Sequence, residues 1–319
     1  MPWQDTRDPY RVWLSEIMLQ QTQVAAAVPY YLRFLERFPE VGALAAASEE
    51  DVLRLWSGLG YYARGRNLLR AAREVVALGG FPDTAEALQA LPGVGPSTAA
   101  AIAAFAFGRR AAILDGNVKR VLARRFGVQG EKAQWALARD LLPEKDIETY
   151  TQALMDLGAT VCTRANPACG RCPVAGECVA LREDRIDQLP APRKRKALPR
   201  RRANWLVLLH RDAVLLERRP AAGIWGGLWS FPEGPATGLR DYCRRTFAAD
   251  IAAPRRLPVV EHGFTHFRLD LQPLLCRLTR RPARDPRGGR VWLALSDADT
   301  APLPAPVRAL LSGLRDQAL

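Results

Sequence analysis

The chain has 319 residues, of which 48% are hydrophobic, so it is long enough for two domains with packed cores. It contains no run of 18 consecutive apolar residues, and its start, MPWQDTRDPY, lacks the charged and apolar regions of a signal peptide. We therefore expect a cytoplasmic protein without a membrane span. The formal net charge of +13 favours a polyanionic partner, with nucleic acid as the first candidate.

The first half of the chain has the apolar periodicity of helices. Apolar residues recur at three- and four-residue spacing, and Gly and Pro fall mainly between the periodic segments. The predicted helices cover residues 11–22, 24–37, 48–57, 61–78, 84–90, 96–107, 117–127, 131–142 and 146–161. We expect residues 1–181 to form an all-α domain that ends in a cysteine-rich loop.

The second half of the chain changes in character. Short segments rich in strand formers and two helical segments predict a smaller α+β domain over residues 204–319. The strands are expected at 205–210, 213–219, 267–278 and 290–295, and the helices at 241–247 and 306–317. Residues 182–203 include RKRKALPRRR, in which seven of ten residues are basic, together with nearby prolines. This composition predicts an extended linker that faces a polyanion.

Four of the six cysteines lie close together in VCTRANPACGRCPVAGEC, residues 161–178. The four are Cys162, Cys169, Cys172 and Cys178. A reducing cytoplasm argues against disulfides, which leaves a structural zinc ion or an iron–sulfur cluster. Zinc sites more often use two separated C-x2-C pairs, so the single close pair favours a cluster while zinc stays open. Cys243 and Cys276 lie far apart in sequence and are expected to be ordinary buried thiols.

The segment ALPGVGPSTAAAIAAFAF, residues 90–107, joins a glycine turn to the start of a helix. Gly93 and Gly95 let backbone N–H groups approach a phosphate, and the positive end of the following helix dipole helps to bind it. A plain helical hairpin without a ligand is the alternative. The basic composition of the chain favours contact with a DNA backbone.

Asp115 stands directly before the next predicted helix, in ILDGNVKRVLARRF. Taken alone, this position predicts a helix N-cap. Lys119 and Arg120 follow on the same helix and face either phosphate or solvent.

Glu16 is the only charged residue in VWLSEIMLQQTQVAAAVPYYL, residues 12–32. A carboxyl buried in such a helix has a raised pKa, as a general acid needs. A surface Glu is the alternative, although other charges normally accompany it in an amphipathic helix. Gln20 lies one turn further on the same face, and its neutral amide is suited to reading base edges.

Five motifs occur in one order: SEIMLQQTQV, GLGYYARGRNL, LPGVG, LDGNVKR and the cysteine spacing. Together they resemble the adenine DNA glycosylase family of the helix-hairpin-helix superfamily, from Pro2-Trp3 into the C-terminal domain. The resemblance implies base excision repair of double-stranded DNA that contains 8-oxoguanine:A or G:A mispairs. It also implies one [4Fe–4S] cluster on the four cysteines and a monomer that associates with the bacterial nucleoid through DNA.

The resemblance assigns roles to individual residues. Glu16 would protonate adenine N7, Asp115 would stabilise the sugar cation, and Asn117 would hold that carboxylate and water. Ser97 stands where bifunctional relatives carry a catalytic lysine, which implies hydrolysis with weak lyase activity at most. The further expected contacts are Trp3, Leu19 and Gln152 around the flipped adenine, Gln21 and Tyr61 in the base stack, Thr22 and Leu59 at the 8-oxoguanine, and Gly93, Gly95, Ser97, Lys119 and Arg164 at the DNA backbone.

The second domain resembles the Nudix-like domain of the same family, with GIWGGLWSFPEG at residues 223–234 as the matching run. RRTFAAD stands where a working Nudix hydrolase has R-E-x-x-E-E, so no pyrophosphatase activity is expected. Phe264, Thr265 and His266 align with a Phe-Ser-His loop that recognises 8-oxoguanine in many members. Thr265 keeps the hydroxyl donor.

Two other functions are consistent with parts of the sequence. A bifunctional glycosylase for damaged pyrimidines disagrees with Ser97 and with the presence of the second domain. A non-catalytic DNA-binding redox sensor would need neither Glu16 nor Asp115.

Overall fold

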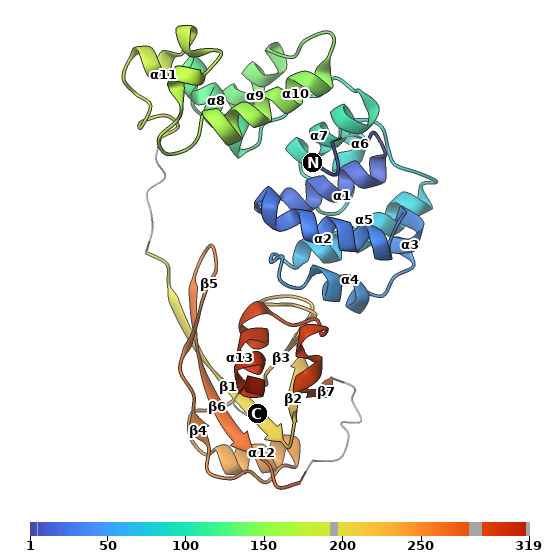
Figure 1. Ribbon diagram of the computed structural model, residues 1–319, viewed down its shortest axis with the longest axis vertical. Helices are drawn as coiled ribbons and strands as arrows, with labels where there is room; N and C mark the ends of the chain where they lie inside the picture. The colour runs from blue at the N-terminus through green and yellow to red at the C-terminus, as the bar shows by residue number, and fades with distance from the viewer. Residues whose placement is uncertain (5, 192–196, 281–288, 317–319) are drawn as a thin grey trace. The chain divides into compact units, whose positions relative to one another are not determined.

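The computed structural model describes residues 1–4, 6–191, 197–280 and 289–316 (Figure 1). It divides into two compact units. The helical unit consists of Met1–Ala47 and Asn67–Arg195, and the sheet unit consists of Ser48–Arg66 and Lys196–Leu319. Among the described residues, no helix is both long enough and apolar enough to cross a membrane.

The N-terminal part of the chain is all α, as predicted. Its helices are α1 (Pro9–Leu19), α2 (Val24–Arg37), α3 (Val41–Ala45), α4 (Glu49–Trp56), α5 (Ala63–Ala77), α6 (Ala85–Gln89), α7 (Pro96–Phe107), α8 (Gly116–Phe126), α9 (Glu131–Asp140), α10 (Ile147–Asp156) and α11 (Val179–Arg182). α1 ends three residues earlier than predicted because Gln21 takes a left-handed conformation, with φ +56°. The five-residue helix α3 escaped prediction because it is too short to show a period.

α7 is the central helix of the helical unit. Its residues from Ala99 to Ala104 are all buried, so the helix is covered on every side. Ala101 packs with Ile113, Leu114 and Val118, which precede or begin α8. Small side chains on α7 therefore let α1, α6 and α10 pack close to it.

The C-terminal part of the chain is α+β, which confirms the predicted fold class. Its elements are β1 (Arg200–His210), β2 (Ala213–Arg218), β3 (Trp229–Ser230), α12 (Leu239–Phe247), β4 (Arg255–Arg256), β5 (Val260–Gly263), β6 (Arg268–Arg277), β7 (Arg290–Ala294) and α13 (Ala305–Asp316). The strands form one mixed sheet in the order β3-β2-β1-β6-β4, with β5 on β6 and β7 on β2. β1 and β6 run parallel, and the other pairs are antiparallel.

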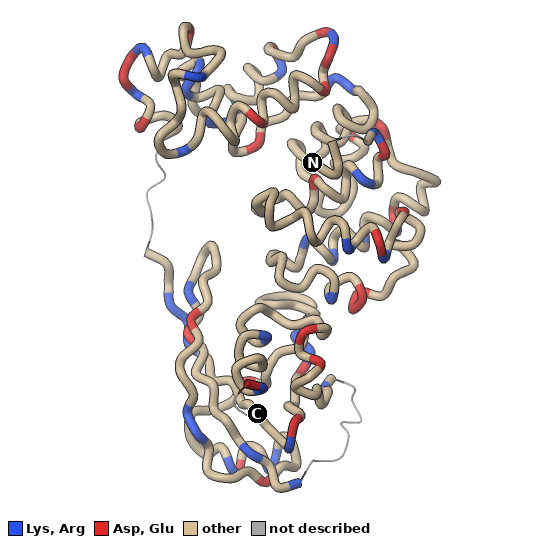
Figure 2. Tube along the Cα trace, viewed as in Figure 1, with Lys and Arg blue, Asp and Glu red and all other residues tan. Residues whose placement is uncertain are grey.

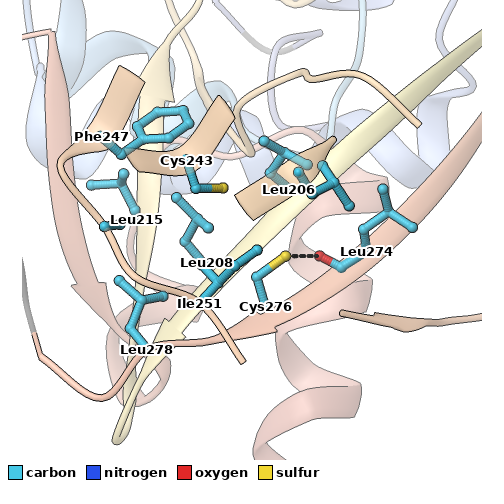
Figure 3. Close-up of a cluster of buried hydrophobic side chains, with 11 residues drawn as sticks. Leu206, Leu208, Leu215, Cys243, Phe247, Ile251, Leu274, Cys276 and Leu278 are labelled. Atoms are coloured by element: carbon cyan, nitrogen blue, oxygen red, sulfur yellow. Dashed lines mark hydrogen bonds between the residues drawn. The ribbon is translucent and has the colours of Figure 1, made fainter. Parts of the chain in front are cut away.

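The core of the sheet unit lies between α12 and one face of the sheet (Figure 3). Leu206 and Leu208 of β1 meet Cys243 of α12 and Cys276 of β6 in this cluster. Both cysteines are fully buried and free, as expected. Trp205 alternates with these leucines and is also fully buried, so both faces of β1 are covered.

The predicted linker over residues 182–203 is ordered at both ends. Leu189 is buried, and its carbonyl accepts a hydrogen bond from Arg124. β1 begins at Arg200, so the last residues of the basic run belong to the sheet. Residues 192–196, which include Arg193 to Lys196 of that run, and the end of the predicted C-terminal helix at 317 lie outside the described residues.

Candidate active site and cysteine-lined pocket

Glu16 and Asp115 come together in the helical unit. Glu16 lies on α1 and Asp115 is the N-cap of α8, where its Oδ1 accepts a hydrogen bond from Val118 N at 2.7 Å. Burial, and then the negative charge of Asp115, raise the pKa of Glu16 to about 7. Both side chains are only partly covered, so they remain accessible to a ligand. The pair places a carboxyl group with a raised pKa beside a second carboxyl group.

Asn117 is fixed by Arg120 on the next turn of α8. The Nη2 of Arg120 donates to Asn117 Oδ1 at 2.9 Å and to Gly158 O at 2.6 Å. Its Nε donates to Cys162 O at 2.6 Å. Arg120 therefore points into the protein toward carbonyl oxygens, and the expected choice between phosphate and solvent was wrong for this residue.

The glycine turn before α7 contacts the end of α1. Gly93 has φ +81°, and a Cβ there would lie 2.8 Å from Asn67 Cβ, so both conformation and space require glycine. Gln20 Nε2 donates to Gly93 O and to Thr98 Oγ1, each at 3.2 Å. Gly95 is the N-cap of α7. Gln20 thus joins the helix that carries Glu16 to the hairpin.

Ser97 lies on the first turn of α7, near the Asp115 segment. Its Oγ accepts a hydrogen bond from Leu114 N at 3.2 Å. A hydroxyl therefore lies beside the segment that leads to Asp115.

The four clustered cysteines line one pocket. Its remaining walls are mostly apolar and comprise Arg124, Val161, Pro167, Ala175, Leu181 and Ile186. Burial, and then the other three cysteines, raise the pKa of the Cys169 thiol. Four thiolates in this space therefore need positive charge from a bound group.

The chemistry of the pocket lining suits a bound metal cluster. In the part of the chain that the structure describes, no group of three or more His, Cys, Asp or Glu side chains could hold a single metal ion. Four cysteines around an apolar pocket fit the chemistry of an iron–sulfur cluster.

Arg124 holds the cysteine loop and was missed in the sequence. It is 4% exposed, and it donates to Leu189 O at 2.8 Å, Thr163 O at 2.7 Å and Arg164 O at 3.1 Å. Its spacing of four residues from Arg120 was the available signal, since both lie on one face of α8.

Leu59 and Tyr61 belong to the sheet unit, in the turn between α4 and α5. Leu59 is 8% exposed, whereas Tyr61 is 46% exposed and has φ +48°. Trp56 Nε1 donates to Gly60 O at 3.1 Å, and Arg64 Nη2 donates to the carbonyls of Leu59 at 3.3 Å and Gly60 at 3.2 Å. The turn is therefore a braced structure that presents an aromatic ring to solvent.

Phe264, Thr265 and His266 form the tight turn between β5 and β6. Phe264 N donates to Phe267 O at 2.9 Å. Thr265 and His266 are exposed, with 3.3 Å between Thr265 Oγ1 and His266 Nδ1. The three exposed arginines Arg200–Arg202 begin the neighbouring β1 (Figure 2). The turn thus presents polar groups beside positive charge.

The other predicted contact residues lie in the helical unit. Trp3 packs edge-on against Tyr31 with ring centroids 5.1 Å apart, and Gln152 Nε2 donates to Asp156 Oδ1 at 2.9 Å. Lys119 Nζ is paired with Glu131 Oε1 at 2.9 Å. The remaining positions are partly exposed at Leu19 and Thr22 and exposed at Gln21 and Arg164.

Comparison with known proteins agrees with this architecture. The family described as HhH-GPD superfamily base excision DNA repair protein matches residues 14–143, and the NUDIX domain family matches residues 204–313. An adenine DNA glycosylase of Buchnera aphidicola subsp. Baizongia pistaciae is 32% identical, covering 99% of this chain and 92% of its own. One of Mus musculus is 35% identical, covering 92% of this chain and 70% of its own.

Among solved structures, that of a thermostable thymine-DNA glycosylase has a TM-score of 0.54 and 31% identity over 57% of this chain and 88% of that one. The fold and the two family matches define a helix-hairpin-helix protein of base excision DNA repair with an appended Nudix-like domain. Relatives that align with nearly the whole chain identify its family more narrowly. The chain belongs to the adenine DNA glycosylase family, and its activity is that of a DNA N-glycosylase.

Proposed function

We propose that the protein hydrolytically removes adenine mispaired with 8-oxoguanine, and with guanine, from double-stranded DNA. The observation that carries this proposal is the pairing of Glu16, with its pKa raised to about 7, with Asp115 at the N-cap of α8. Two carboxyl groups in unlike environments can divide the work of an acid and an anion. The target adenine must leave the base stack before either group reaches it.

Each carboxyl group has a separate task in the proposed reaction. Protonated Glu16 donates its proton to adenine N7, and the electron pair of the C1′–N9 bond departs with the neutral base. The carboxylate of Asp115 stabilises the positive charge that develops on the sugar. Water then forms the new bond to C1′ and gives a proton to Glu16, which restores its acid form. Asn117, held by Arg120, supports this end of the site.

We propose that the enzyme is monofunctional. Ser97 carries a hydroxyl whose oxygen accepts a hydrogen bond from Leu114 N, so this position supplies no amine for a Schiff base. Lys119 is paired with Glu131, which favours weak trapping of the opened sugar at most.

Recognition of the opposite base is assigned to two segments of the sheet unit. The turn Phe264–His266 presents a hydroxyl and an imidazole at its tip. Leu59 lies in the braced turn after α4, from which Tyr61 would enter the base stack. In the helical unit, Thr22 would meet the same base, while Gln21 fills the stack and Trp3, Leu19, Gln20 and Gln152 face the adenine. Gly93, Gly95, Ser97, Lys119 and Arg164 would meet the backbone, on which positive charge positions the protein.

We propose one [4Fe–4S] cluster on the four cysteines. A bound cluster would cross-link residues 161–178 through iron–thiolate bonds. Arg124 fixes the carbonyls of Thr163 and Arg164, which directly follow Cys162, and the side chain of Arg164 is left exposed to meet DNA. We further propose that the enzyme acts as a monomer in the cytoplasm and lacks pyrophosphatase activity, since Arg245, Ala248 and Ala249 stand where the R-E-x-x-E-E run of working hydrolases has its glutamates.

The test is single-turnover release of adenine from duplexes that carry it opposite 8-oxoguanine or guanine. Release should occur with both, should be lost in Glu16→Gln, and should leave little adduct after borohydride trapping. Iron analysis should give about four iron atoms per chain. Tight binding without release by the unaltered enzyme would contradict catalysis and indicate a lesion-binding protein. Abundant trapped adduct would contradict the monofunctional assignment alone.

A further inference from the structure

The segment GIWGGLW, residues 223–229, touches one of the two segments that would recognise the base opposite adenine. We refer to it as the Trp225 loop. The ring centroid of Trp225 lies 5.4 Å from that of His262 and 5.8 Å from that of Phe264. Phe264 in turn stacks on Phe267 at 4.5 Å with an interplanar angle of 18°. The turn that carries Thr265 therefore rests on a row of rings that begins at Trp225.

The row of rings continues into the core of the sheet unit. Trp225 is 5.9 Å from Trp205, which is fully buried and lies 5.3 Å from Phe231. Trp225 itself is 8% exposed and has φ +53°, a conformation that a bulky residue keeps only when its surroundings hold it. The indole of Trp225 therefore packs between the buried Trp205 and Phe264.

The same loop touches the two helices that flank the other recognition segment, α4 before the Leu59–Tyr61 turn and α5 after it. Gly226 O accepts a hydrogen bond from Arg66 Nη1. A Cβ on Gly227 would lie 2.9 Å from Glu49 Oε1 and 3.1 Å from Leu53 Cδ1. Trp229 Nε1 donates to Glu50 Oε1 at 3.4 Å. The loop therefore packs directly on α4, which leads into the braced turn of Leu59 and Tyr61.

The Phe264–His266 turn rests on the Trp225 loop, and the helices on either side of the Leu59–Tyr61 turn pack on the same loop. We propose that Trp225 is a positioning residue for recognition of the base opposite adenine, and that the Trp225 loop sets the spacing between the Leu59–Tyr61 turn and the Phe264–His266 turn. This inference rests on the proposed function of those turns. Trp225 need not touch DNA, because it acts through the rings of Phe264 and His262.

The test measures discrimination, defined as the ratio of single-turnover adenine release rates with 8-oxoguanine:A and G:A duplexes. Trp225→Ala should lower this ratio roughly tenfold, because it removes two aromatic contacts beneath the turn. Trp225→Phe should restore most of it. Trp292→Ala is the matched control, since Trp292 lies in the same unit but faces His210, at 6.5 Å, and it should leave the ratio unchanged.

A combined variant separates positioning from general damage. Thr265→Ala alone should lower discrimination, and adding Trp225→Ala should lower it no further, because Trp225 acts through that turn. Gly227→Ala probes the opposite side of the loop and should also lower the ratio, by pressing a methyl group on α4. This second variant decides the question if Trp225→Ala fails to fold, as judged by circular dichroism.

Three results would overturn the inference. An unchanged ratio in Trp225→Ala or Gly227→Ala would show that the loop does not set the spacing. Additive losses in the combined variant, or equal loss of release with both duplexes, would show a structural role only. No effect of Thr265→Ala would instead refute the proposed function of the turn, and the inference with it.

Discussion

Arg124 reaches from α8 to the sulfur of Cys162, with 3.5 Å between its Nη1 and the Sγ. The same guanidinium donates to three carbonyl oxygens on both sides of the cysteine loop. A buried arginine with this many acceptors connects the loop firmly to α8. The helix that begins at Asp115 and the four-cysteine pocket are therefore parts of one rigid assembly.

Arg124→Ala should deplete the protein of iron. The substitution leaves buried carbonyl oxygens without donors, which costs about 3 kcal/mol or more of folding free energy. Iron content per chain and the thermal midpoint of unfolding would both fall. Arg164→Ala is the control, because only its carbonyl takes part in the loop: iron content should hold while affinity for DNA drops. Normal iron content in Arg124→Ala would refute this account.

Adenine release should depend on pH through Glu16. Its pKa is raised to about 7, so the acid form that donates the proton is lost as the pH rises through that value. Single-turnover rates should therefore fall on the alkaline side of about pH 7. A rate that stays flat up to about pH 9 would exclude Glu16 as the proton donor.

Glu16→Gln should also change how stability depends on pH. Because the folded pKa lies above the ordinary value of 4.5, ionisation of Glu16 destabilises the fold as the pH rises from about 4.5 through about 7. Below that window both states hold the proton and the group has no effect. Denaturant unfolding should show the variant to be more stable than the parent at pH 8 and similar at pH 4. The opposite order would mean that Glu16 is not desolvated.

Gly158→Ala should impair catalysis from outside the site. A Cβ at Gly158 would lie 2.6 Å from Asn117 Cβ and 3.0 Å from the Asn117 carbonyl, so the start of α8 must shift. Overpacking of this kind costs about 1–3 kcal/mol. Adenine release should slow and the melting temperature should fall. Gly170→Ala, where an added Cβ meets no atom within 4 Å, should do neither.

Gln20→Ala should weaken the link between the catalytic helix and the hairpin. It removes the hydrogen bonds to Gly93 O and Thr98 Oγ1, each worth about 1 kcal/mol. Affinity for undamaged duplex, measured by fluorescence anisotropy, should drop several-fold at low salt. Gln23→Ala is a suitable comparison, because Gln23 is exposed and makes no capping hydrogen bond. Equal effects of the two variants would argue against the link.

Much of the fold was predictable from local pattern. The helices from α4 to α9 agree with their apolar periodicity. The isolated charge of Glu16 predicted a carboxyl group with a raised pKa, and the structure brings this group close to Asp115. Short strands such as β3 and β4 escaped prediction because two residues carry no period. The inward orientation of Arg120 and Arg124 was not predicted, because arginine is usually exposed. Its burial depends on carbonyl oxygens that are distant in the sequence.

The grouping of Ser48–Arg66 with the sheet was likewise beyond local pattern. Ser57 Oγ donates to Leu303 O at 2.7 Å, and Arg308 Nη2 donates to Ser57 Oγ at 2.8 Å, so residues some 250 positions apart make this contact. The amphipathic sequence of α4 predicts that one face of the helix is covered, but it does not identify the part of the chain that covers this face.

This grouping changes what a truncated enzyme would be. Cutting the chain in the segment 192–196 looks like the removal of one domain, yet it divides the sheet unit itself and leaves α4 on the wrong fragment. The N-terminal fragment would keep Glu16, Asp115 and all four clustered cysteines. On this fragment, the apolar surface around Leu53 would lose the Trp225 loop that covers it. The turn that carries Tyr61 would lose the contacts of α4 and α5 with the same loop. Low adenine release by such a fragment would therefore reflect the lost packing of α4 as much as the loss of the Phe264–His266 turn.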